Sequence, residues 1–441
     1  MKTEILWHVT VLSNFAKGYD KYARRYSKAS LLQSTFPDQF FLLREMELHV
    51  GVRKAGGLLP RLGIRGDRLI AMQTQVPAVE LRENTRTGIG RYVERGWITL
   101  TGVAWVDADG KVGMSTIEEV MAESLCLMKE GLNDFISLRP RSFSVLPVAR
   151  GCQASCPFCF SDASASAEQD QARLDLEKVE RHAKEAARLG AERFVITGGG
   201  EPGLVRHELL LKLIRAGGGP LRKAVLITNG HHLARREEEA RAQMLAAYSE
   251  AGLNVLAISR HHHNDSTSAR LMSLETDVAA VARTWRRGRG IWHDLNLRLI
   301  CVLQQDAVED MATMEAYVDW ASSIGVEELC FKELYVSTSI ESVYHRHASN
   351  AWSHEHQVPL ALVLDFTSKY GFIEVARLPW GAPVFRGEWR GAPMQIAAYT
   401  EPSLLWERTH GIARSWNLMA DGRCLVSLED RNSEINLGLT A

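Results

Sequence analysis

The chain has 441 residues, of which 46% are hydrophobic and 24% are charged, and it contains 13 prolines. This composition excludes disordered, collagen-like and coiled-coil proteins. The 52 lysines and arginines balance 53 aspartates and glutamates, so no overall positive field favours a nucleic acid or an anionic membrane as a partner. A short basic stretch over residues 17–28 is more typical of a solvated face, and we therefore do not expect a nucleic-acid partner.

The first residues contain no apolar run typical of a secretory signal, and no later window has the ~18 uncharged apolar residues of a membrane span. These features predict a cytoplasmic protein that makes no membrane contact. The seven cysteines are an odd number, and three of them lie within residues 152–159. This distribution favours a metal site in a reducing compartment over a disulfide framework.

The sequence divides into three predicted regions. Residues 1–135 are predicted to form an N-terminal α+β extension, because residues 97–115 alternate apolar and polar side chains on both sides of an Asp-Gly turn. Residues 136–372 alternate short β-branched runs with amphipathic helical stretches, which is typical of βα units and a parallel sheet. Residues 373–441 are rich in Gly, Pro and Trp and are predicted to form a small β-rich cap.

Six strands are predicted in the central region, and the helices lie between them. Six units favour an α/β fold with a partial (β/α)6 TIM-like barrel over a closed barrel of eight units. In parallel α/β folds the reacting residues gather at the C-terminal ends of the strands. The predicted strands are residues 143–149, 192–198, 223–228, 254–259, 295–303 and 326–334.

The strongest chemical signal is a C-x3-C-x2-C run made by Cys152, Cys156 and Cys159, directly after the first predicted strand. Three thiolates in one loop can hold three irons of a 4Fe-4S cluster, and the fourth iron then keeps an open position. A zinc site would need a fourth Cys or His ligand, which the nearby sequence lacks.

This run resembles the cysteine motif of the radical S-adenosylmethionine (radical SAM) superfamily. The resemblance implies that Cys152, Cys156 and Cys159 bind one 4Fe-4S cluster and that S-adenosylmethionine chelates the fourth iron. It also implies that an electron from an external donor of the flavodoxin or ferredoxin type leads to a 5'-deoxyadenosyl radical, which abstracts a substrate hydrogen. The C-terminal region has only Cys424, so a second cluster is not expected.

Other positions match places where this family contacts the cofactor. Thr197-Gly198-Gly199-Gly200-Glu201-Pro202 resembles the glycine-rich motif near the methionyl amino group, although it also fits a tight turn. Phe158 matches an aromatic position beside the adenine, and Asn229 and Ser259 end the third and fourth predicted strands. The predicted cofactor contacts therefore include Phe158, Gly199, Gly200, Glu201, Asn229 and Ser259.

Strand alternation suggests further inward side chains at the same end of the barrel. In the fifth strand Arg298 faces inward, where it can reach a carboxylate of the cofactor or substrate, or form a buried structural ion pair. In the sixth strand Lys332 faces inward, whereas Glu333 follows Phe331 outward unless the strand has already ended. Together with His261 after the fourth strand, Lys332 and Glu333 are the predicted catalytic residues.

In length and arrangement the chain resembles the radical SAM 1,2-diol dehydratases of aminoglycoside biosynthesis, of the apramycin-pathway type. This resemblance implies a lyase that takes hydrogen from an aminosugar 1,2-diol and leads to loss of water, as in C3' deoxygenation of a paromamine-type substrate. A hydroxyl leaves more easily with a positioned acid, and a cationic aminosugar favours carboxylates in the pocket.

Two alternatives remain open. One is a radical SAM enzyme that modifies RNA or a peptide; in the RNA reading Cys330 or Cys424 carries a methyl group. The other is a non-catalytic iron-sulfur or zinc protein, which would need a fourth ligand and would not need Asn229 and Ser259 at successive strand ends.

Overall fold

A computed structural model describes most of the chain after residue 132 and five strands before it. The described ranges are residues 2–11, 61–65, 68–69, 98–107, 112–115, 133–161, 174–292, 294–337, 342–344, 347–402 and 404–437. The chain divides into two compact units. The smaller consists of Met1–Leu132, Val336–Ile340 and Pro379–Gly381, and the larger holds the remainder.

Within the first unit, five strands form one sheet in the order β3-β2-β1-β4-β5. The predicted hairpin is confirmed, because β4 pairs antiparallel with β5 and places Val106 opposite Val112. The basic residues between 17 and 28 lie outside the described residues. The strands are β1 (Lys2–Val11), β2 (Arg61–Arg65), β3 (Arg68–Leu69), β4 (Ile98–Asp107) and β5 (Val112–Ser115).

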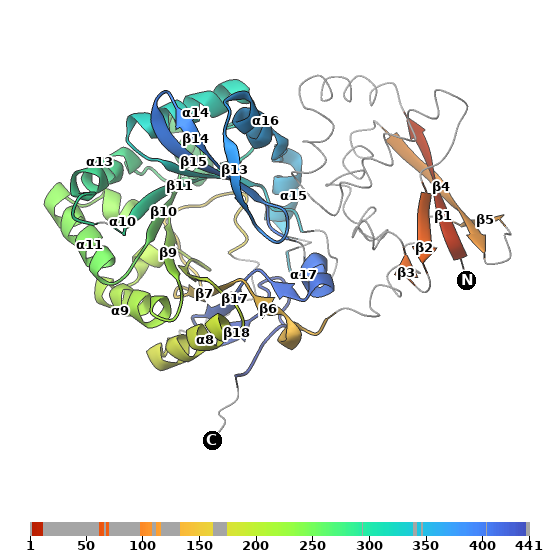
Figure 1. The fold of residues 1–441 in the computed structure, drawn as a ribbon, viewed down its shortest axis with the longest axis horizontal. Coiled ribbons are helices and arrows are strands. Elements are labelled where there is room, and N and C mark those ends of the chain that lie inside the picture. The colour runs from red at the N-terminus through yellow and green to blue at the C-terminus, as the bar shows by residue number, and fades with distance from the viewer. Residues whose placement is uncertain are drawn as a thin grey trace. The chain divides into compact units, whose positions relative to one another are not determined.

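All six predicted strands of the central region are present, and consecutive strands pair in parallel. Helices lie between them in sequence and around the outside of the strands in space (Figure 1). The partial (β/α)6 arrangement predicted from the sequence is therefore confirmed. The strands are β7 (Ser142–Leu146), β8 (Arg193–Ile196), β9 (Lys223–Thr228), β10 (Val255–Ser259), β11 (Asn296–Leu303) and β12 (Glu328–Glu333).

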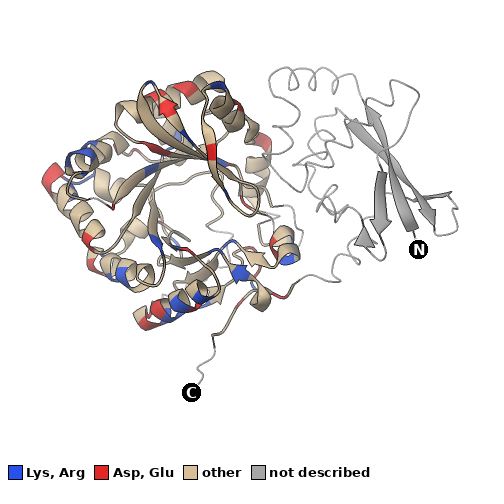
Figure 2. Cartoon of the chain, viewed as in Figure 1, with Lys and Arg blue, Asp and Glu red and all other residues tan. Residues whose placement is uncertain are grey.

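Several helices begin after a side chain that accepts one of the first free backbone N–H groups. Asp175, Asp277 and Asp310 accept such bonds ahead of three of them. Acidic and basic residues alternate along the solvent-facing side of α8 (Figure 2). The helices are α8 (Leu176–Arg188), α9 (His207–Gly218), α10 (His231–Ala234), α11 (Glu238–Glu250), α12 (Asp265–Met272), α13 (Val278–Gly288), α14 (Met311–Ser323), α15 (Ala348–His356), α16 (Ala361–Lys369) and α17 (Leu404–His410), with short 3-10 turns η1 (Phe135–Ser137) and η3 (Pro202–Leu204).

The strands of the C-terminal region extend the same sheet at both of its edges. β15 (Ala392–Tyr399) pairs in parallel with β12, and β14 (Pro383–Trp389) and β13 (Ile373–Arg377) follow it. At the other edge β17 (Trp416–Met419) pairs in parallel with β7 and is followed by β18 (Cys424–Leu425). A separate short pair joins β6 (Arg139–Pro140) to β16 (Ile412–Ala413).

The eleven-stranded sheet ends at β13 and β18, which do not pair with each other in the described part of the chain. The barrel is thus open, as the sequence predicted. The domain boundaries at residues 135 and 372 stay predictions. Among the described residues no helix is both long and apolar enough to cross a bilayer.

The two faces of the strands differ in burial. Along β11 and β12, Leu297, Leu299, Phe331 and their alternate neighbours are fully buried against the helices, whereas the residues between them keep accessible surface. Inward residues of four strands form one apolar cluster: Val195, Val225, Ile227, Val255, Ala257 and Ile300. The interior of the open barrel is therefore less tightly filled than its helix-facing side.

Candidate active site

The three cysteines lie in the loop that follows β7. Cys152 and Cys159 are exposed and Cys156 is half-buried. The loop is held at its middle and at its last cysteine, since the Ser155 N–H donates to the Met272 carbonyl at 2.8 Å and the Ser349 hydroxyl donates to the Cys159 carbonyl at 2.8 Å. The Ala154 N–H lies 3.3 Å from the Cys152 sulfur and can donate to it.

The thiols are close enough to affect one another. Burial and the neighbouring thiols of Cys159 and Cys152 raise the pKa of Cys156 to about 12. Three adjacent thiolates therefore need a cation to stabilise them, and iron supplies that positive charge. No three His, Cys, Asp or Glu side chains of the described residues converge as ligands of a single metal ion. A 4Fe-4S cluster does not require such convergence, because each cysteine binds a different iron.

The glycine run after β8 packs directly against the cysteine loop. The Gly200 N–H donates to the Val148 carbonyl and the Glu201 N–H to the Gly151 carbonyl, both at 2.9 Å. A Cβ on Gly200 would lie 2.2 Å from the Gly151 oxygen, so only glycine allows this approach. Gly199 is buried between its neighbours, and its contact with a cofactor stays a prediction.

The Glu201 side chain forms hydrogen bonds with other groups of the protein. Its carboxylate accepts the Gly203 N–H at 2.6 Å, the Thr228 hydroxyl at 2.5 Å and the Asn229 N–H at 2.8 Å. These bonds join the end of β8 to the end of β9. The carboxylate of Glu201 therefore positions the residues beside the loop, and the cofactor contact predicted for Glu201 stays a prediction.

Asn229 is a predicted cofactor contact that the structure places beside a cysteine of the loop. It follows β9, is buried, and directs its side-chain N–H groups to the Cys152 sulfur at 3.6 Å and to the Gln153 amide oxygen at 3.2 Å. Its own amide oxygen accepts the His231 N–H at 2.9 Å, which fixes the side-chain orientation. Asn229 thus lies beside the predicted cluster.

Aromatic side chains connect the cysteine loop to the barrel interior. Phe158 lies 5.1 Å from His261 and 5.8 Å from Trp352, measured between ring centroids. Phe160 stacks on Tyr344 at 4.5 Å and contacts Tyr335 at 6.0 Å. The predicted adenine contact of Phe158 stays a prediction. The sequence did not indicate that Trp352 contacts Phe158, because helix α15 has no strong apolar period.

His261, a predicted catalytic residue, is buried just after the end of β10, and its catalytic role stays a prediction. Burial, Arg260 and Lys332 lower its pKa to about 3, and its Nδ1 accepts the Val302 N–H at 3.1 Å. The imidazole is therefore neutral at physiological pH and holds Phe158 and the end of β11 in place.

Glu333 is corrected. Strand β12 continues through Glu333, so the alternation continues and the side chain follows Phe331 to the helix-facing side, where it is buried and accepts the Thr400 hydroxyl at 3.4 Å. Lys332 faces inward as predicted, and Ser259 continues the inward face of Val255 and Ala257 at the end of β10.

Arg298 forms the structural ion pair that the sequence left open. Its guanidinium lies 2.7 and 3.0 Å from the Glu328 carboxylate, which belongs to the first residue of β12. Glu328 precedes Lys332 by four strand residues, or roughly 13 Å. The predicted contact between Arg298 and the cofactor carboxylate is thus corrected, because Arg298 lies toward the amino ends of the strands.

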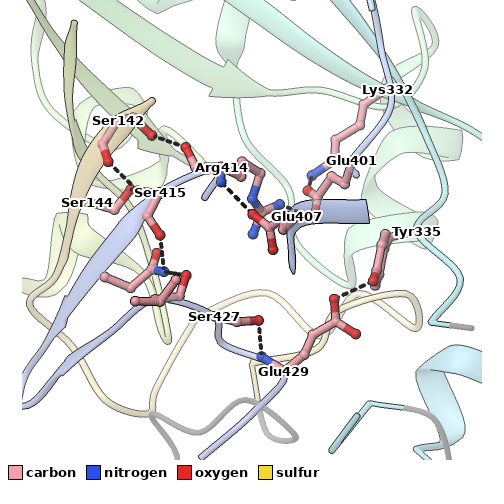
Figure 3. Close-up of polar contacts among 12 residues, drawn as sticks. Ser142, Ser144, Lys332, Tyr335, Glu401, Glu407, Arg414, Ser415, Ser427 and Glu429 are labelled. Atoms are coloured by element: carbon pink, nitrogen blue, oxygen red, sulfur yellow. Dashed lines mark hydrogen bonds and ion pairs between the residues drawn. The ribbon is translucent and has the colours of Figure 1, made fainter. Parts of the chain in front are cut away.

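The sequence analysis missed a polar network at the open side of the barrel. Glu401 follows β15 and forms ion pairs with Lys332 of β12 and with Arg414, which precedes β17. Figure 3 shows these side chains pointing toward one another, with Glu407 beside Arg414. The side chains of Lys332, Glu401 and Arg414 keep 30%, 15% and 29% of their surface accessible, so the network borders open space.

Two further carboxylates belong to this network. Glu407 of α17 accepts the Arg414 N–H, and Glu429 accepts the hydroxyls of Tyr335 and Ser342. Burial raises the pKa of Glu407 to about 8, and nearby Glu429 and Glu401 add to the effect although Arg414 opposes it. The network thus holds three carboxyl groups beside two cations, and the raised pKa of Glu407 favours its uncharged form at neutral pH.

The comparison with protein families decides the nature of the cysteine loop. Residues 146–311 match the radical SAM superfamily. This range begins at the end of β7 and includes the cysteines, the glycine run, Asn229 and Ser259. Residues 146–311 form a radical SAM domain.

No curated protein matches the chain in sequence. Among solved structures the chain is similar to SuiB of Streptococcus suis bound to S-adenosylmethionine, with 15% identity, a TM-score of 0.42, and coverage of 71% of this chain and 65% of that one, less than two thirds of its length. It is also similar to coproporphyrinogen III oxidase of Escherichia coli, a radical SAM enzyme, with 14% identity, 57% and 56% coverage and a TM-score of 0.35.

Proteins of the radical SAM family bind S-adenosylmethionine and a 4Fe-4S cluster, and these are the cofactors of the radical SAM domain described here. The three thiols, the amide of Asn229 and the close backbone of the glycine run fit this pair chemically. When both cofactors are bound, the chemistry that they supply is the reductive cleavage of S-adenosylmethionine to a radical that abstracts hydrogen. The protein's own residues hold the loop and shape the space beside it.

Proposed function

We propose that the chain is a radical SAM 1,2-diol dehydratase that acts on an aminosugar of the paromamine type. The observation that carries the proposal is a group of three carboxyl side chains, Glu401, Glu407 and Glu429, at the open side of the barrel. Burial is the main cause of the raised pKa of Glu407, and the cations described beside these groups are Lys332 and Arg414. An ammonium group of a bound substrate favours the ionised form of Glu407 and pairs with it.

The position of the network relative to the cysteine loop supports the same reading. Tyr335 donates to Glu429 and contacts Phe160, the residue after Cys159. A sugar that binds the carboxylates therefore lies near the loop that holds the cofactors. The accessible surface of Lys332 and Arg414 leaves room for hydroxyl groups that form hydrogen bonds with charged side chains.

Lys332 is our candidate for assisting the leaving hydroxyl. Its ammonium faces inward, pairs with Glu401 and lies 5.6 Å from the centre of the Tyr399 ring. In the proposed reaction one carbinol carbon of the substrate loses a hydrogen atom to the 5'-deoxyadenosyl radical. The neighbouring C–O bond then breaks, water leaves with a proton donated by Lys332, and the remaining carbinol O–H gives its proton back to Lys332 as it becomes a carbonyl. The remaining carbonyl radical takes one electron from the external donor and one proton, giving a deoxy ketone.

We further propose that the electron donor is of the flavodoxin or ferredoxin type and that the protein is cytoplasmic. An RNA-modifying enzyme would need a reactive thiol to carry the methyl group. Cys424 fits this role poorly, because it is buried and burial raises the pKa of its thiol to about 12.

The test is anaerobic incubation of the iron-reconstituted protein with dithionite, S-adenosylmethionine and a panel containing paromamine, neutral sugars, a peptide and RNA. We expect 5'-deoxyadenosine together with loss of the mass of water from the aminosugar alone. Glu401→Gln should reduce dehydration, whereas the exposed Glu388→Gln should not. Deoxyadenosine formation with an unchanged aminosugar would refute the substrate assignment.

A further inference from the structure

A second charged group lies inside the barrel, at the end opposite to the cysteine loop. Arg193 and Lys223 are the first residues of β8 and β9, and Arg298 lies near the start of β11. All three belong to the inward faces of their strands, because they alternate with Val195, Val225 and Ile300 of the inner apolar cluster. We call Arg193, Lys223 and Arg298 the amino-end cations.

The carboxylates nearby are already paired. Glu328 bonds with Arg298, and Glu192 lies 4.0 Å from Arg141. No ion pair is described for Arg193 or Lys223 within residues 133–437 as far as the structure describes them. Counting Arg141 with the amino-end cations gives four positive charges against two carboxylates, a net charge of two.

The amino-end cations repel one another electrostatically. Burial and then Arg298 lower the pKa of both Arg193 and Lys223. Glu328 raises the pKa of Lys223, and Tyr399 and Glu192 raise the pKa of Arg193. In both cases the pKa is still lowered overall. Charged groups that repel each other in a partly buried place are stabilised by a counter-ion.

The place is also open enough for a ligand. The side chains of Arg298 and Glu328 keep 22% and 19% of their surface accessible although both face the interior. Gln395 of β15 is register partner of Glu328 and has a half-buried side chain on the same face. Arg193 and Lys223 are register partners on neighbouring strands, and the charge of Arg298 acts on both of them.

We propose that Arg193, Lys223 and Arg298 bind an oxyanion of the phosphate class at the amino-terminal end of the barrel. Guanidinium groups bind phosphate oxygens in pairs, and a lysine adds a point charge. The site lies at the amino ends of the strands, whereas Lys332 lies near the carboxyl end of β12, four residues after Glu328, and the ligand proposed here is an anion whereas the substrate proposed above is a cation. The inference does not depend on the proposed function.

The test measures thermal unfolding of the reconstituted full-length protein against inorganic phosphate, with sodium chloride of equal ionic strength as reference. We expect a saturable rise in melting temperature that chloride does not reproduce. Lys223→Met should weaken phosphate binding roughly tenfold or more, as loss of a charged hydrogen bond implies. Lys212→Met, an exposed lysine of α9, should leave it unchanged.

Arg193→Gln serves as a second variant if Lys223→Met does not fold, with circular dichroism as the check. Equal phosphate responses in Lys223→Met or Arg193→Gln and in Lys212→Met would overturn the proposal. A wild-type response that phosphate and chloride share, or no saturable response, would overturn it as well, since the cations would then be compensated within the chain.

Discussion

The side-chain amide of Asn229 lies 3.6 Å from the sulfur of Cys152 and joins the end of β9 to the loop after β7. Hydrogen bonds to cluster sulfurs favour the reduced, more negative form of an iron-sulfur centre. The amide therefore has a direct electronic consequence for a cluster held by this cysteine, as well as a structural one.

Asn229→Ala is expected to lower the reduction potential of the cluster, because Cys152 loses a donor. A bond worth about 1 kcal/mol corresponds to roughly 40 mV for a one-electron couple. The potential is measured by a redox titration followed by electron paramagnetic resonance. Gln153→Ala is the matched control, since it removes the other acceptor of Asn229 and keeps the bond to Cys152. Equal reduction potentials of the cluster in the wild type and in Asn229→Ala would show that Asn229 does not influence the cluster electronically.

Gly200→Ala is expected to separate the glycine run from the cysteine loop, because its Cβ would lie 2.2 Å from the Gly151 oxygen and 2.8 Å from a Val148 methyl group. Overpacking of this kind lowers the unfolding free energy by about 1–3 kcal/mol. We expect iron content after reconstitution to fall together with stability. Gly290→Ala meets nothing within 4 Å and should retain both. Full iron content in Gly200→Ala would contradict the proposed packing.

Glu407 predicts a pH dependence of stability. Its folded pKa of about 8 lies above the ordinary value of 4.5, so the folded state binds the proton more tightly than the unfolded state. Stability contributed by this proton is fully present below about pH 4.5 and is lost as the pH rises toward 8, at up to about 1.4 kcal/mol per pH unit.

Glu407→Gln should flatten this decline, as measured by chemical denaturation between pH 5 and 8. The groups that face Glu407 are Arg414, Glu429 and Glu401, with Lys332 acting through Glu401. Glu388→Gln, at an exposed position, should keep the wild-type slope. An unchanged slope in Glu407→Gln would show that Glu407 is ionised in the folded protein.

The sequence was sufficient to predict the six strands of the barrel, because β-branched runs and helical periods alternate clearly along residues 143–334. The cysteine spacing and the strand-end position of Asn229 also predicted which residues meet, since parallel strands end at one edge. Alternation placed Lys332 inward correctly and gave Glu333 an outward position if the strand continued, which it does.

Ion pairs between residues that are far apart in the sequence could not be predicted in the same way. The partner of Arg298 depends on the register between β11 and β12, which puts Glu328 directly opposite it. Glu401 and Arg414 meet because β15 and β17 add to opposite edges of the sheet, and short C-terminal strands give no periodic signal of that. The neutral state of His261 follows from its burial, which its neighbours in sequence do not reveal.

The most direct test of the account is reductive cleavage of S-adenosylmethionine by the reconstituted wild-type protein and by Cys156→Ala, with Cys330→Ala as the control cysteine outside the loop. We predict that wild type and Cys330→Ala bind a 4Fe-4S cluster and form 5'-deoxyadenosine with dithionite, and that Cys156→Ala does neither. An intact cluster in the wild-type protein with no deoxyadenosine formed would contradict the assignment of this site.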